Sequence, residues 1–254
     1  METTLTNSIT SSEAGTTTTA DGGTPPEDRF TRYSGIVSPR AIQQTKAFVV
    51  GVGSIGRNIA LQLAQLGVGW IVMADPDTVS PVNLGTQGYR PSQINLPKVN
   101  ACGSDALAIN PDCKVTTFEC RMPSPDFRTD LWGDVVFLTT DTMSSRRAMI
   151  LALQEQTESR RPKLVVDVRM LGEVFQVRCF VPTTSTLEVY MKDHIFDDSE
   201  ALPGTCSTRT TGYGATCAAS FAVASLAKFL RGKPVVPLIA VDLFTCDIDQ
   251  SYPW

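Results

Sequence analysis

Short apolar runs alternate with stretches of helical periodicity from Lys46 onward, after a polar N-terminal segment. The runs Lys46–Val52 and Trp70–Ala74 are short and almost wholly apolar, which predicts two buried strands. Between them, apolar residues recur at helical spacing and predict a helix with one buried face: Ile55, Ile59, Leu63 and Leu66. This strand–helix–strand order is typical of a parallel βαβ unit.

The same alternation continues through the rest of the chain. We predict further strands at 115–120, 135–140, 164–168, 174–181 and 238–244, and helices at 99–109, 147–154 and 215–230. The segment between the strands at 164–168 and 174–181 is short, which favours a hairpin. We therefore expect an α/β fold, with a Rossmann-like, doubly wound, mostly parallel sheet and antiparallel strands in its C-terminal part.

The first 28 residues have a different composition. They are rich in Ser, Thr and Gly, with four consecutive threonines at 16–19 and two prolines at 25–26. Such a segment has little apolar surface to bury, so we predict a disordered tail over residues 1–28. Residues 29–254 are long enough to form one α/β domain with a sizeable core.

Charge and hydropathy exclude several classes of function. The formal net charge is -4 and the sequence pI is about 5.1, without a block of basic residues, so we expect no binding to nucleic acid. No apolar run reaches the roughly 18 residues of a membrane span. No basic residue precedes Arg29, which argues against a signal or transit peptide. We expect a cytoplasmic protein that does not associate with membranes.

The cysteines and the single histidine limit the possible metal sites. The chain has seven cysteines, none in a C-x-x-C pair, and His194 is its only histidine. A disulfide framework or a zinc site is not expected from this pattern, so we predict no zinc. His194 lies in the polar segment MKDHIFDD, which we predict to be a loop, and we expect a surface or hydrogen-bonded histidine rather than a catalytic base.

Three glycines after the first predicted strand have the spacing of a nucleotide-binding loop. Gly51 would permit a tight turn, Gly53 would let the backbone approach a phosphate, and Gly56 would let the helix pack on the strand. The helix that follows would offer free N–H groups and a positive dipole end to an anion. Asp75 ends the second predicted strand and would accept hydrogen bonds from ribose hydroxyls. These features suit NAD and ATP equally, and the glycines alone could also serve close packing.

The residues after the second strand are more specific. They are DPDTVSPVNLGTQ at 75–87, PK at 97–98, INP at 109–111 and TD at 140–141. These motifs resemble the ThiF/MoeB/HesA family, the bacterial relatives of ubiquitin-activating enzymes. The resemblance covers about residues 32–244 and is strongest over 49–111, where the family pattern D-x-D-x-V-x-x-x-N-L-x-R-Q is met at all but one place.

The resemblance implies a reaction and a set of partners. Members of the family bind ATP and Mg²⁺ and adenylate the C-terminal carboxylate of a ubiquitin-fold protein, or occasionally another carboxylate. They act as homodimers or as heterodimers with a related subunit. For this chain the resemblance therefore implies an ATP-dependent adenylyltransferase whose residues 29–254 form one ThiF-type nucleotide-binding domain.

The resemblance also assigns roles to residues. Asp75 would bind ribose, Asn83 and Lys98 would contact phosphates, Asp141 would hold Mg²⁺ and Gln87 would hold the site loop. Taken singly, Lys98 could be a solvated lysine, Asp141 a helix N-cap and Asn83 a turn residue. Only their common order supports the site. The implied nucleotide-binding set is Gly51, Gly53, Ser54, Ile55, Gly56, Asp75, Asp77, Asn83, Gln87, Lys98 and Asp141, of which Asn83, Lys98 and Asp141 would also be catalytic.

Two family arginines are missing. Thr86 stands in place of the arginine of N-L-x-R-Q, and Gly35 in place of the second arginine of R-Y-x-R-Q, which reaches the phosphates of the partner subunit. Both losses remove a cation from the triphosphate site. Arg90 and Arg209 could take over, or the protein could be a catalytically inactive partner subunit that binds a second protein.

A cysteine nucleophile is a further possibility. Family members often carry a cysteine in the loop before the last helix, and Cys206 lies in the comparable region, close in sequence to Arg209. A nearby cation favours the thiolate form. Cys206 could equally be an ordinary small apolar residue. Cys217, within the Ala-rich helix, is expected in the core.

An NAD-dependent oxidoreductase is the remaining alternative. It explains the segment from Gly51 to Asp75 but leaves Asn83, Lys98 and Asp141 without a role. The chain also lacks an evident hydride-transfer site. The sequence therefore favours the adenylyltransferase.

Overall fold

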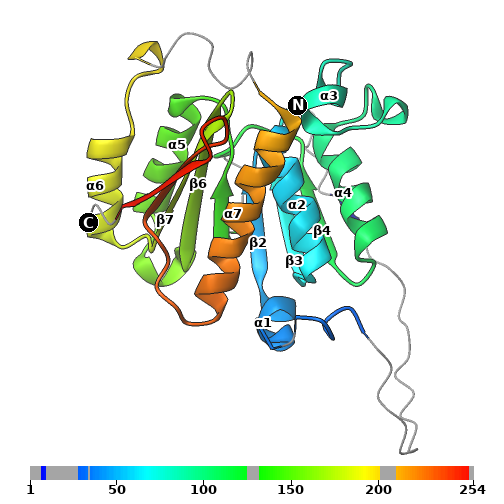
Figure 1. The fold of residues 1–254 in the computed structure, drawn as a ribbon, viewed down its shortest axis with the longest axis horizontal. Coiled ribbons are helices and arrows are strands. Elements are labelled where there is room, and N and C mark those ends of the chain that lie inside the picture. Colours follow the sequence, from blue (N-terminus) through cyan, green and yellow to red (C-terminus); the bar gives the residue numbers. More distant parts are fainter. Residues whose placement is uncertain (1–6, 10–27, 34, 125–131, 201–209, 252–254) are drawn as a thin grey trace, which may run out of the picture.

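The structure is a computed structural model. It describes residues 7–9, 28–33, 35–124, 132–200 and 210–251. Its centre is a mixed sheet whose strands are ordered β1-β4-β3-β2-β5-β6-β7-β8-β9 (Figure 1). The five strands from β4 to β6 are parallel, and the pairs at both ends of the sheet are antiparallel. The strands are β1 (Asn7–Ile9), β2 (Lys46–Val50), β3 (Trp70–Ala74), β4 (Lys114–Phe118), β5 (Val135–Leu138), β6 (Leu164–Leu171), β7 (Val174–Phe180), β8 (Leu238–Asp242) and β9 (Asp247–Ser251).

Helices cover both faces of this sheet. α2, α4 and α7 pack on one face, and α5 and α6 pack on the other (Figure 1). Because alternate residues of a strand face opposite sides, Ala47 and Val49 of β2 join one core while Phe48 and Val50 join the other. The α-helices are α1 (Pro39–Gln44), α2 (Ser54–Leu66), α3 (Asn83–Gln87), α4 (Lys98–Ile109), α5 (Met143–Gln154), α6 (Thr184–His194) and α7 (Gly212–Leu230).

The fold class predicted from the sequence is confirmed, including the hairpin of β6 and β7, whose turn is Gly172 and Glu173. The placement of His194 in a loop was wrong, because His194 is the last residue of α6. This helix is capped by the hydroxyl of Thr183, and it buries only Leu187 and Tyr190 on the sheet. Two buried apolar residues give too weak a periodicity to be recognised in the sequence. The short elements α1, α3 and β9 were also missed.

The N-terminal tail differs from the prediction at three residues. Asn7–Ile9 form β1, which pairs antiparallel with β4 between Asn7 and Thr117 and between Ile9 and Val115. β4 would otherwise be the edge of the sheet, with unpaired backbone groups that can accept another strand. The tail's remaining residues up to 27 lie outside the described part of the chain.

α7 is the one described helix that is long and apolar enough to cross a membrane, by length and composition alone, with a mean hydropathy of 1.3. In this fold α7 instead packs against α2, β6 and β7. Its small residues, among them Ala215, Ala218, Ala219 and Ala222, are fully buried. An Ala-rich face of this kind lets two helices approach closely, so α7 has the character of a core helix.

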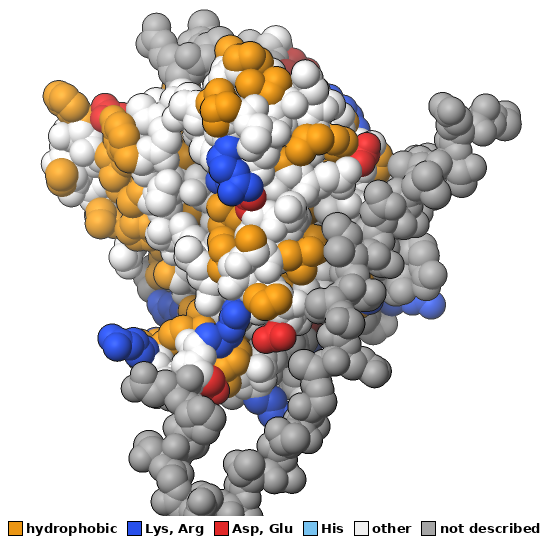
Figure 2. Space-filling model, turned by 90° about the vertical axis from the view of Figure 1, so that its right-hand side faces the viewer, with side chains coloured by type: hydrophobic (Ala, Val, Ile, Leu, Met, Phe, Trp, Pro, Cys, Tyr) orange, Lys and Arg blue, Asp and Glu red, His pale blue; other side chains and the backbone are white. Residues whose placement is uncertain are grey.

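Figure 2 shows the side of the molecule on which α3 and α4 lie in Figure 1. Hydrophobic side chains are interspersed with polar ones across this face, and Lys and Arg side chains stand in small, separate groups. Val82 and Leu96, near α3, are among the exposed large hydrophobic residues of the described chain. The described Lys and Arg side chains on the face shown in Figure 2 therefore do not form a continuous basic patch of the kind that binds a phosphate backbone.

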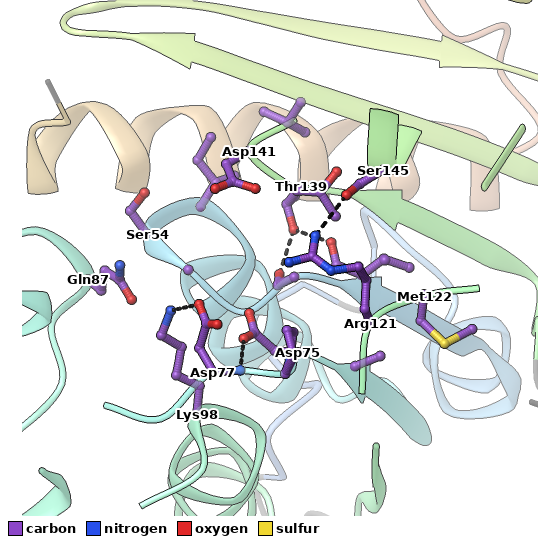
Figure 3. Close-up of a pocket in the computed structure, with 18 of the residues that line it drawn as sticks. Ser54, Asp75, Asp77, Gln87, Lys98, Arg121, Met122, Thr139, Asp141 and Ser145 are labelled. Carbon is purple, nitrogen blue, oxygen red and sulfur yellow. Dashed lines mark hydrogen bonds and ion pairs between the residues drawn. The ribbon is translucent and has the colours of Figure 1, made fainter. Parts of the chain in front are cut away.

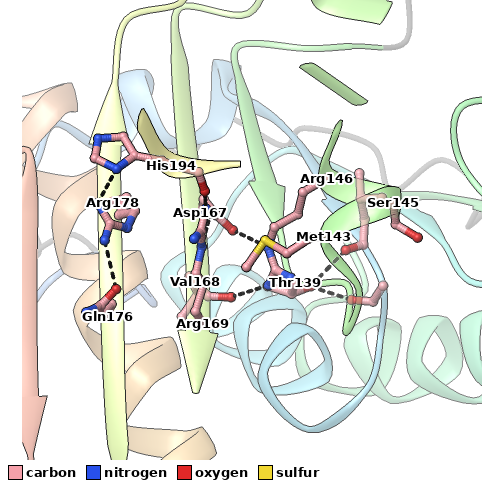
Figure 4. A network of polar contacts seen from close by, with 12 residues as sticks. Thr139, Met143, Ser145, Arg146, Asp167, Val168, Arg169, Gln176, Arg178 and His194 are labelled. Carbon is pink, nitrogen blue, oxygen red and sulfur yellow. Dashed lines mark hydrogen bonds and ion pairs between the residues drawn. The ribbon is translucent and has the colours of Figure 1, made fainter. Parts of the chain in front are cut away.

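A buried carboxylate joins the helices of the second face to the sheet. Asp167 of β6 is fully buried and accepts hydrogen bonds from Arg146 Nε of α5 at 2.8 Å and from Arg169 Nε at 2.7 Å (Figure 4). Tyr190 of α6 donates its hydroxyl to the same carboxylate. Burial alone would raise the pKa of Asp167, but Arg169, Arg146 and the Tyr190 hydroxyl outweigh burial and hold this pKa well below its usual range.

Replacement of this carboxylate by an amide tests the network. We expect Asp167→Asn to lower the free energy of unfolding at pH 7 by about 3–5 kcal/mol, because the buried Arg146 and the partly buried Arg169 lose their counter-ion. The folded-state pKa lies below the unfolded value of about 3.9, so the stabilisation is complete above that value. This stabilisation is lost as the pH falls toward the folded-state pKa. The difference in free energy of unfolding between wild type and Asp167→Asn therefore becomes smaller at acidic pH.

Urea denaturation at pH 7 and at several acidic pH values measures both effects. Asp112→Asn, which changes an exposed carboxylate, serves as the matched control and should shift stability by less than about 0.5 kcal/mol. Equal stability of wild type and Asp167→Asn at pH 7 would show that the network does not hold the helices.

Candidate functional site

A pocket of about 400 Å³ lies where the parallel strands end (Figure 3). Its walls come from the segments that follow β2, β3, β4 and β5, together with residues of α2, α3, α5 and β6. β2 lies between β3 and β5, so the chain leaves β2 toward one side of the sheet and reaches β5 on the other. In open α/β sheets, ligands bind at such a switch point, outside the carboxyl ends of the strands.

The glycine loop forms the turn from β2 into α2. Gly51 has φ 89°, a conformation that side chains rarely adopt. A Cβ at Gly56 would lie 1.8 Å from the carbonyl oxygen of Gly51, so only glycine lets α2 pack on this turn. A Cβ at Gly53 would meet no atom within 4 Å, although Gly53 lines the pocket. Packing therefore explains the first and third glycines, and open space beside the second remains for a ligand.

The N-terminus of α2 presents donors to the same pocket. Gly53 is the N-cap and supplies no side-chain hydrogen bond, and Ser54 and Ile55 line the pocket. The first N–H groups of an α-helix have no partner within the helix, and the helix dipole adds a partial positive charge there. These donors suit an anion such as a phosphate.

Asp75 ends β3 and is 6% exposed. Its two oxygens accept hydrogen bonds from the backbone N–H groups of Val52 at 2.8 Å and Asp77 at 2.9 Å. Burial raises the pKa of Asp75, and the charge of Lys98 partly opposes this. The backbone bonds fix the carboxylate at the pocket wall, while its remaining lone pairs can still accept hydroxyl donors.

Lys98 is the first residue of α4 and is 7% exposed, so it is not a solvated surface lysine. Its Nζ lies 2.8 Å from Oδ2 of Asp77, whose side chain is 61% exposed. Both residues line the pocket. Because Asp77 is exposed to solvent, the Lys98 ammonium can turn from it to an incoming anion without leaving a buried carboxylate unpaired.

α3 contributes two amides to the pocket. Oδ1 of Asn83 accepts from the backbone N–H of Ser80 at 2.8 Å and from its hydroxyl at 3.0 Å, which leaves the amide nitrogen as a donor. Oε1 of Gln87 is buried, and no described residue bonds to it. Asn83 thus closes a turn and still has a free donor, while the role of Gln87 in holding the loop stays a prediction.

The segment after β5 brings polar groups to the opposite wall. Thr139 donates its hydroxyl to the carbonyl oxygens of Val50 at 2.9 Å and Gly51 at 2.6 Å. The N-cap of α5 is Thr142, not Asp141, because the Thr142 hydroxyl accepts from the N–H of Ser145. Asp141 is exposed, lines the pocket and forms no bond or ion pair with the described residues.

Arg121 is a pocket residue that the sequence did not reveal. It follows β4, and its Nη1 donates to the hydroxyl of Ser145 at 3.2 Å, across the pocket (Figure 3). The location of Arg121 at the pocket could have been predicted, because a residue just after a parallel strand lies at the same sheet edge as Asp75 and Asp141. No motif around Arg121 distinguishes it from the other arginines of the chain.

The other candidate cations are placed differently. Arg90 does not line the pocket, and it pairs with Asp105, which also binds Arg57 at 2.7 Å. Arg209 and Cys206 lie outside the described residues. The Thr86 hydroxyl donates a hydrogen bond to the carbonyl oxygen of Val82 at 3.4 Å, and Thr86 does not line the pocket. Arg90 is therefore not a substitute for the missing family arginines in this conformation.

The described residues contain no group of three or more His, Cys, Asp or Glu side chains that could hold a metal ion. Mg²⁺ that accompanies a nucleotide usually takes only one or two carboxylates besides phosphate oxygens and water. Asp141 offers such a carboxylate. The expected absence of zinc stays a prediction.

A comparison with protein families places this site in context. The model of the ThiF family matches residues 32–250. The chain belongs to the ThiF family. The match includes every residue that lines the pocket.

Curated ThiF-family relatives match over shorter segments. The ubiquitin-like modifier-activating enzyme 5 of Caenorhabditis elegans is 28% identical over 129 residues, which are 46% of this chain and 31% of that protein. The sulfur carrier protein ThiS adenylyltransferase of Escherichia coli is 31% identical over 105 residues, 41% of this chain and 42% of that protein. These segments span less than half of each relative's length.

Solved structures share the ThiF-family fold over most of the chain. E. coli MccB with ATP has a TM-score of 0.69 at 15% identity and covers 89% of this chain and 71% of its own. PaaA has a TM-score of 0.66 at 21% identity and covers 84% of this chain and 65% of its own. At these identities the likeness shows the fold alone.

Two glycine substitutions separate packing from ligand binding. We expect Gly56→Ala to destabilise the fold by more than about 2 kcal/mol, because the new Cβ overlaps the Gly51 carbonyl. We expect Gly53→Ala to change stability by less than about 0.5 kcal/mol, because the space beside it is open. Thermal unfolding with and without ATP and Mg²⁺ measures both variants.

In that experiment Gly53→Ala should reduce or abolish the rise in Tm that ATP produces in the wild type. A Gly53→Ala protein that is as stable as wild type and shows the same ATP response would mean that no phosphate approaches this loop.

Proposed function

We propose that this protein is an ATP- and Mg²⁺-dependent adenylyltransferase that activates a carboxylate, namely the C-terminal carboxylate of a ubiquitin-fold protein. The observation that carries the proposal is a pocket that combines three features: a helix N-terminus without a side-chain cap, the buried Lys98, and Asp141, which forms no ion pair with the described residues. Membership of the ThiF family supports the reaction class.

The pocket fits an adenosine polyphosphate in several respects. The open space beside Gly53 admits a phosphate close to the α2 N-terminus. Two buried oxygens that line the pocket, Gln87 Oε1 and Thr140 Oγ1, have no hydrogen-bond partner among the described residues. Such atoms carry a free-energy cost unless a polar group reaches them, and a nucleotide would supply one.

The residues divide the work of adenylation. Asp75 would hold the ribose hydroxyls, while the α2 N–H groups, Lys98 and the Asn83 amide would hold the phosphates. The carboxylate attacks the α-phosphorus and pyrophosphate leaves, so the site must neutralise charge that grows on phosphate oxygens. The nucleophile is already ionised, and no general base is required. Mg²⁺, which Asp141 would hold, supplies further neutralisation when bound.

The family arginine at the position of Thr86 is absent from this chain. We propose that Arg121 supplies the positive charge to the phosphates in its place. Among the described residues the hydrogen-bond partner of Arg121 is the neutral hydroxyl of Ser145, and no described carboxylate forms an ion pair with it, so its charge can serve a phosphate. The arginine missing at Gly35 belongs to a contact between subunits. A homodimer or a heterodimer with a related subunit therefore remains part of the proposal, as does a cytoplasmic location.

The named relatives motivate the choice of substrate. The relatives include activating enzymes for ubiquitin-like modifiers and an adenylyltransferase for the sulfur carrier ThiS. E. coli MccB has been solved with MccA and AMPCPP. All three names concern those proteins, and what they share is a carboxylate presented by a protein or peptide. Because two of the three concern ubiquitin-like modifiers or a sulfur carrier, we propose a ubiquitin-fold protein as the substrate of this chain.

Nucleotide binding is the first test. We expect ATP with Mg²⁺ at about 100 times its Kd to stabilise the fold by about 2.7 kcal/mol, and NAD to have no effect. Pyrophosphate exchange into ATP, stimulated by a ubiquitin-fold protein, then tests adenylation. No response to ATP or AMP would contradict the proposal. ATP binding without exchange, restored by a second subunit with the missing arginines, would support an inactive partner subunit instead.

The cations of the pocket make a second test. We expect Lys98→Gln and Arg121→Gln each to lower kcat/KM for pyrophosphate exchange by about 100-fold, because each removes about 3 kcal/mol of charge stabilisation in the transition state. Lys163→Gln, which changes an exposed lysine paired with Asp134, is the matched control and should leave exchange unchanged. Full activity of Arg121→Gln would remove Arg121 from the site.

A further inference from the structure

A second groove, of about 500 Å³, opens beside the nucleotide pocket. The two cavities share Asp141, Arg146 and Met170 in their walls. The second groove continues along β6 and β7 toward α6, and its lining includes the exposed apolar residues Val174 and Phe196. It therefore leads away from the place where adenylation would occur.

The register of β6 and β7 puts a set of polar side chains on one face of the hairpin. Asp167 lies opposite Arg178, and Arg169 lies opposite Gln176 (Figure 4). Directly opposed residues of an antiparallel pair point to the same side of the sheet. Arg169, Gln176 and Arg178 all line the groove.

Among the described residues, Asp167 pairs with two of the three arginines near this face, and Arg178 is the one that forms no ion pair. Asp167 is shared by Arg146 and Arg169. Arg178 has neutral partners, the amide oxygen of Gln176 at 2.9 Å and Nδ1 of His194 at 3.2 Å. Its Nε is buried with no partner, and no described carboxylate forms an ion pair with it.

The acids at the groove rim do not compensate this charge. Asp198 accepts from the backbone N–H of Met143 at 2.6 Å and so holds the start of α5, while Asp141 and Glu200 form no ion pair with Arg178. Burial lowers the pKa of Arg178, and the charge of Arg169 lowers it further. Burial and the two arginines also lower the pKa of His194, so this side chain is a neutral acceptor at pH 7.

We propose that this groove binds the C-terminal tail of the protein or peptide whose carboxylate is activated, and that Arg178 pairs with an acidic side chain near the end of that tail. The proposal rests on the proposed adenylation. Charge complementarity selects the acid, because a half-buried guanidinium with only neutral partners is stabilised by a carboxylate. The shared wall at Asp141 places the tail's end beside the nucleotide.

The length of the groove favours a tail over a small dicarboxylic acid. Both Val174, at the start of β7, and Arg178 line the groove. A strand rises about 3.3 Å per residue, so these two positions are about 13 Å apart. An extended peptide would cover this distance with about four residues. We therefore place the acid within about the last six residues of the tail.

Synthetic peptides test the assignment. The probes are fluorescein-labelled hexapeptides of Gly and Ala with a free C-terminus and one Glu at each possible position before it, together with the matching Gln peptides. Fluorescence anisotropy gives Kd in the presence of Mg²⁺ and AMPCPP, an ATP analogue that does not release pyrophosphate. We expect at least one Glu peptide to bind wild type 10-fold or more tightly than its Gln counterpart.

Variants at position 178 identify the group responsible. Arg178→Gln should abolish the preference for Glu, and Arg178→Lys should retain part of it. Arg160→Gln removes an exposed arginine outside the groove and should behave like wild type. The rise in Tm with AMPCPP should be the same in all four proteins, which shows that the variants are folded and that the nucleotide pocket is intact.

The outcomes separate this inference from the proposed function. No rise in Tm with AMPCPP in the wild type would contradict the adenylyltransferase itself. A normal rise, with equal binding of Glu and Gln peptides at every position, would overturn the acidic tail alone. Competition by glutarate with a Kd as low as that of the best peptide would overturn the tail as the occupant of the groove.

Discussion

The close approach of α2 to the turn after β2 is the constraint on which the site depends. Gly56 has no side chain, so the helix packs directly on the carbonyl of Gly51, and the Thr139 hydroxyl binds that same carbonyl from the segment after β5. One carbonyl oxygen thus joins β2, α2 and β5. Because these elements meet at this point, the helix N-terminus, Asp75 and the segment up to Asp141 face a common space.

The site contains opposite charges that are only partly paired. Asp75 is fixed by backbone bonds, Asp77 is paired with Lys98, and Asp141 has no described partner. A polyphosphate alone would meet the positive groups, and a cation alone would meet Asp141. The arrangement therefore suits the pair that we propose, ATP and Mg²⁺, in which an anion and a divalent cation enter together.

The local sequence predicted the succession of strands and helices and the position of the glycine loop, and it marked the segment from Asp75 to Lys98, because these features follow one another at fixed spacing along the chain. It failed where a role depends on contacts between distant segments. Arg121 reaches Ser145 only because β4 and β5 end at the same edge, and Arg178 lacks a counter-ion only because Asp167, directly opposite, is already shared by two arginines. The N-cap at Thr142 rather than Asp141 depended on a one-residue shift that sequence patterns do not resolve.

The wall between the two cavities has a thermodynamic consequence. Asp141, Arg146 and Met170 belong to both, so a molecule in one cavity changes the surroundings of a molecule in the other. Ligands that share a wall have a coupling free energy, and that coupling is reciprocal. If a ligand in one cavity raises the affinity of the other cavity for its ligand by some factor, the second ligand raises the affinity of the first cavity by the same factor.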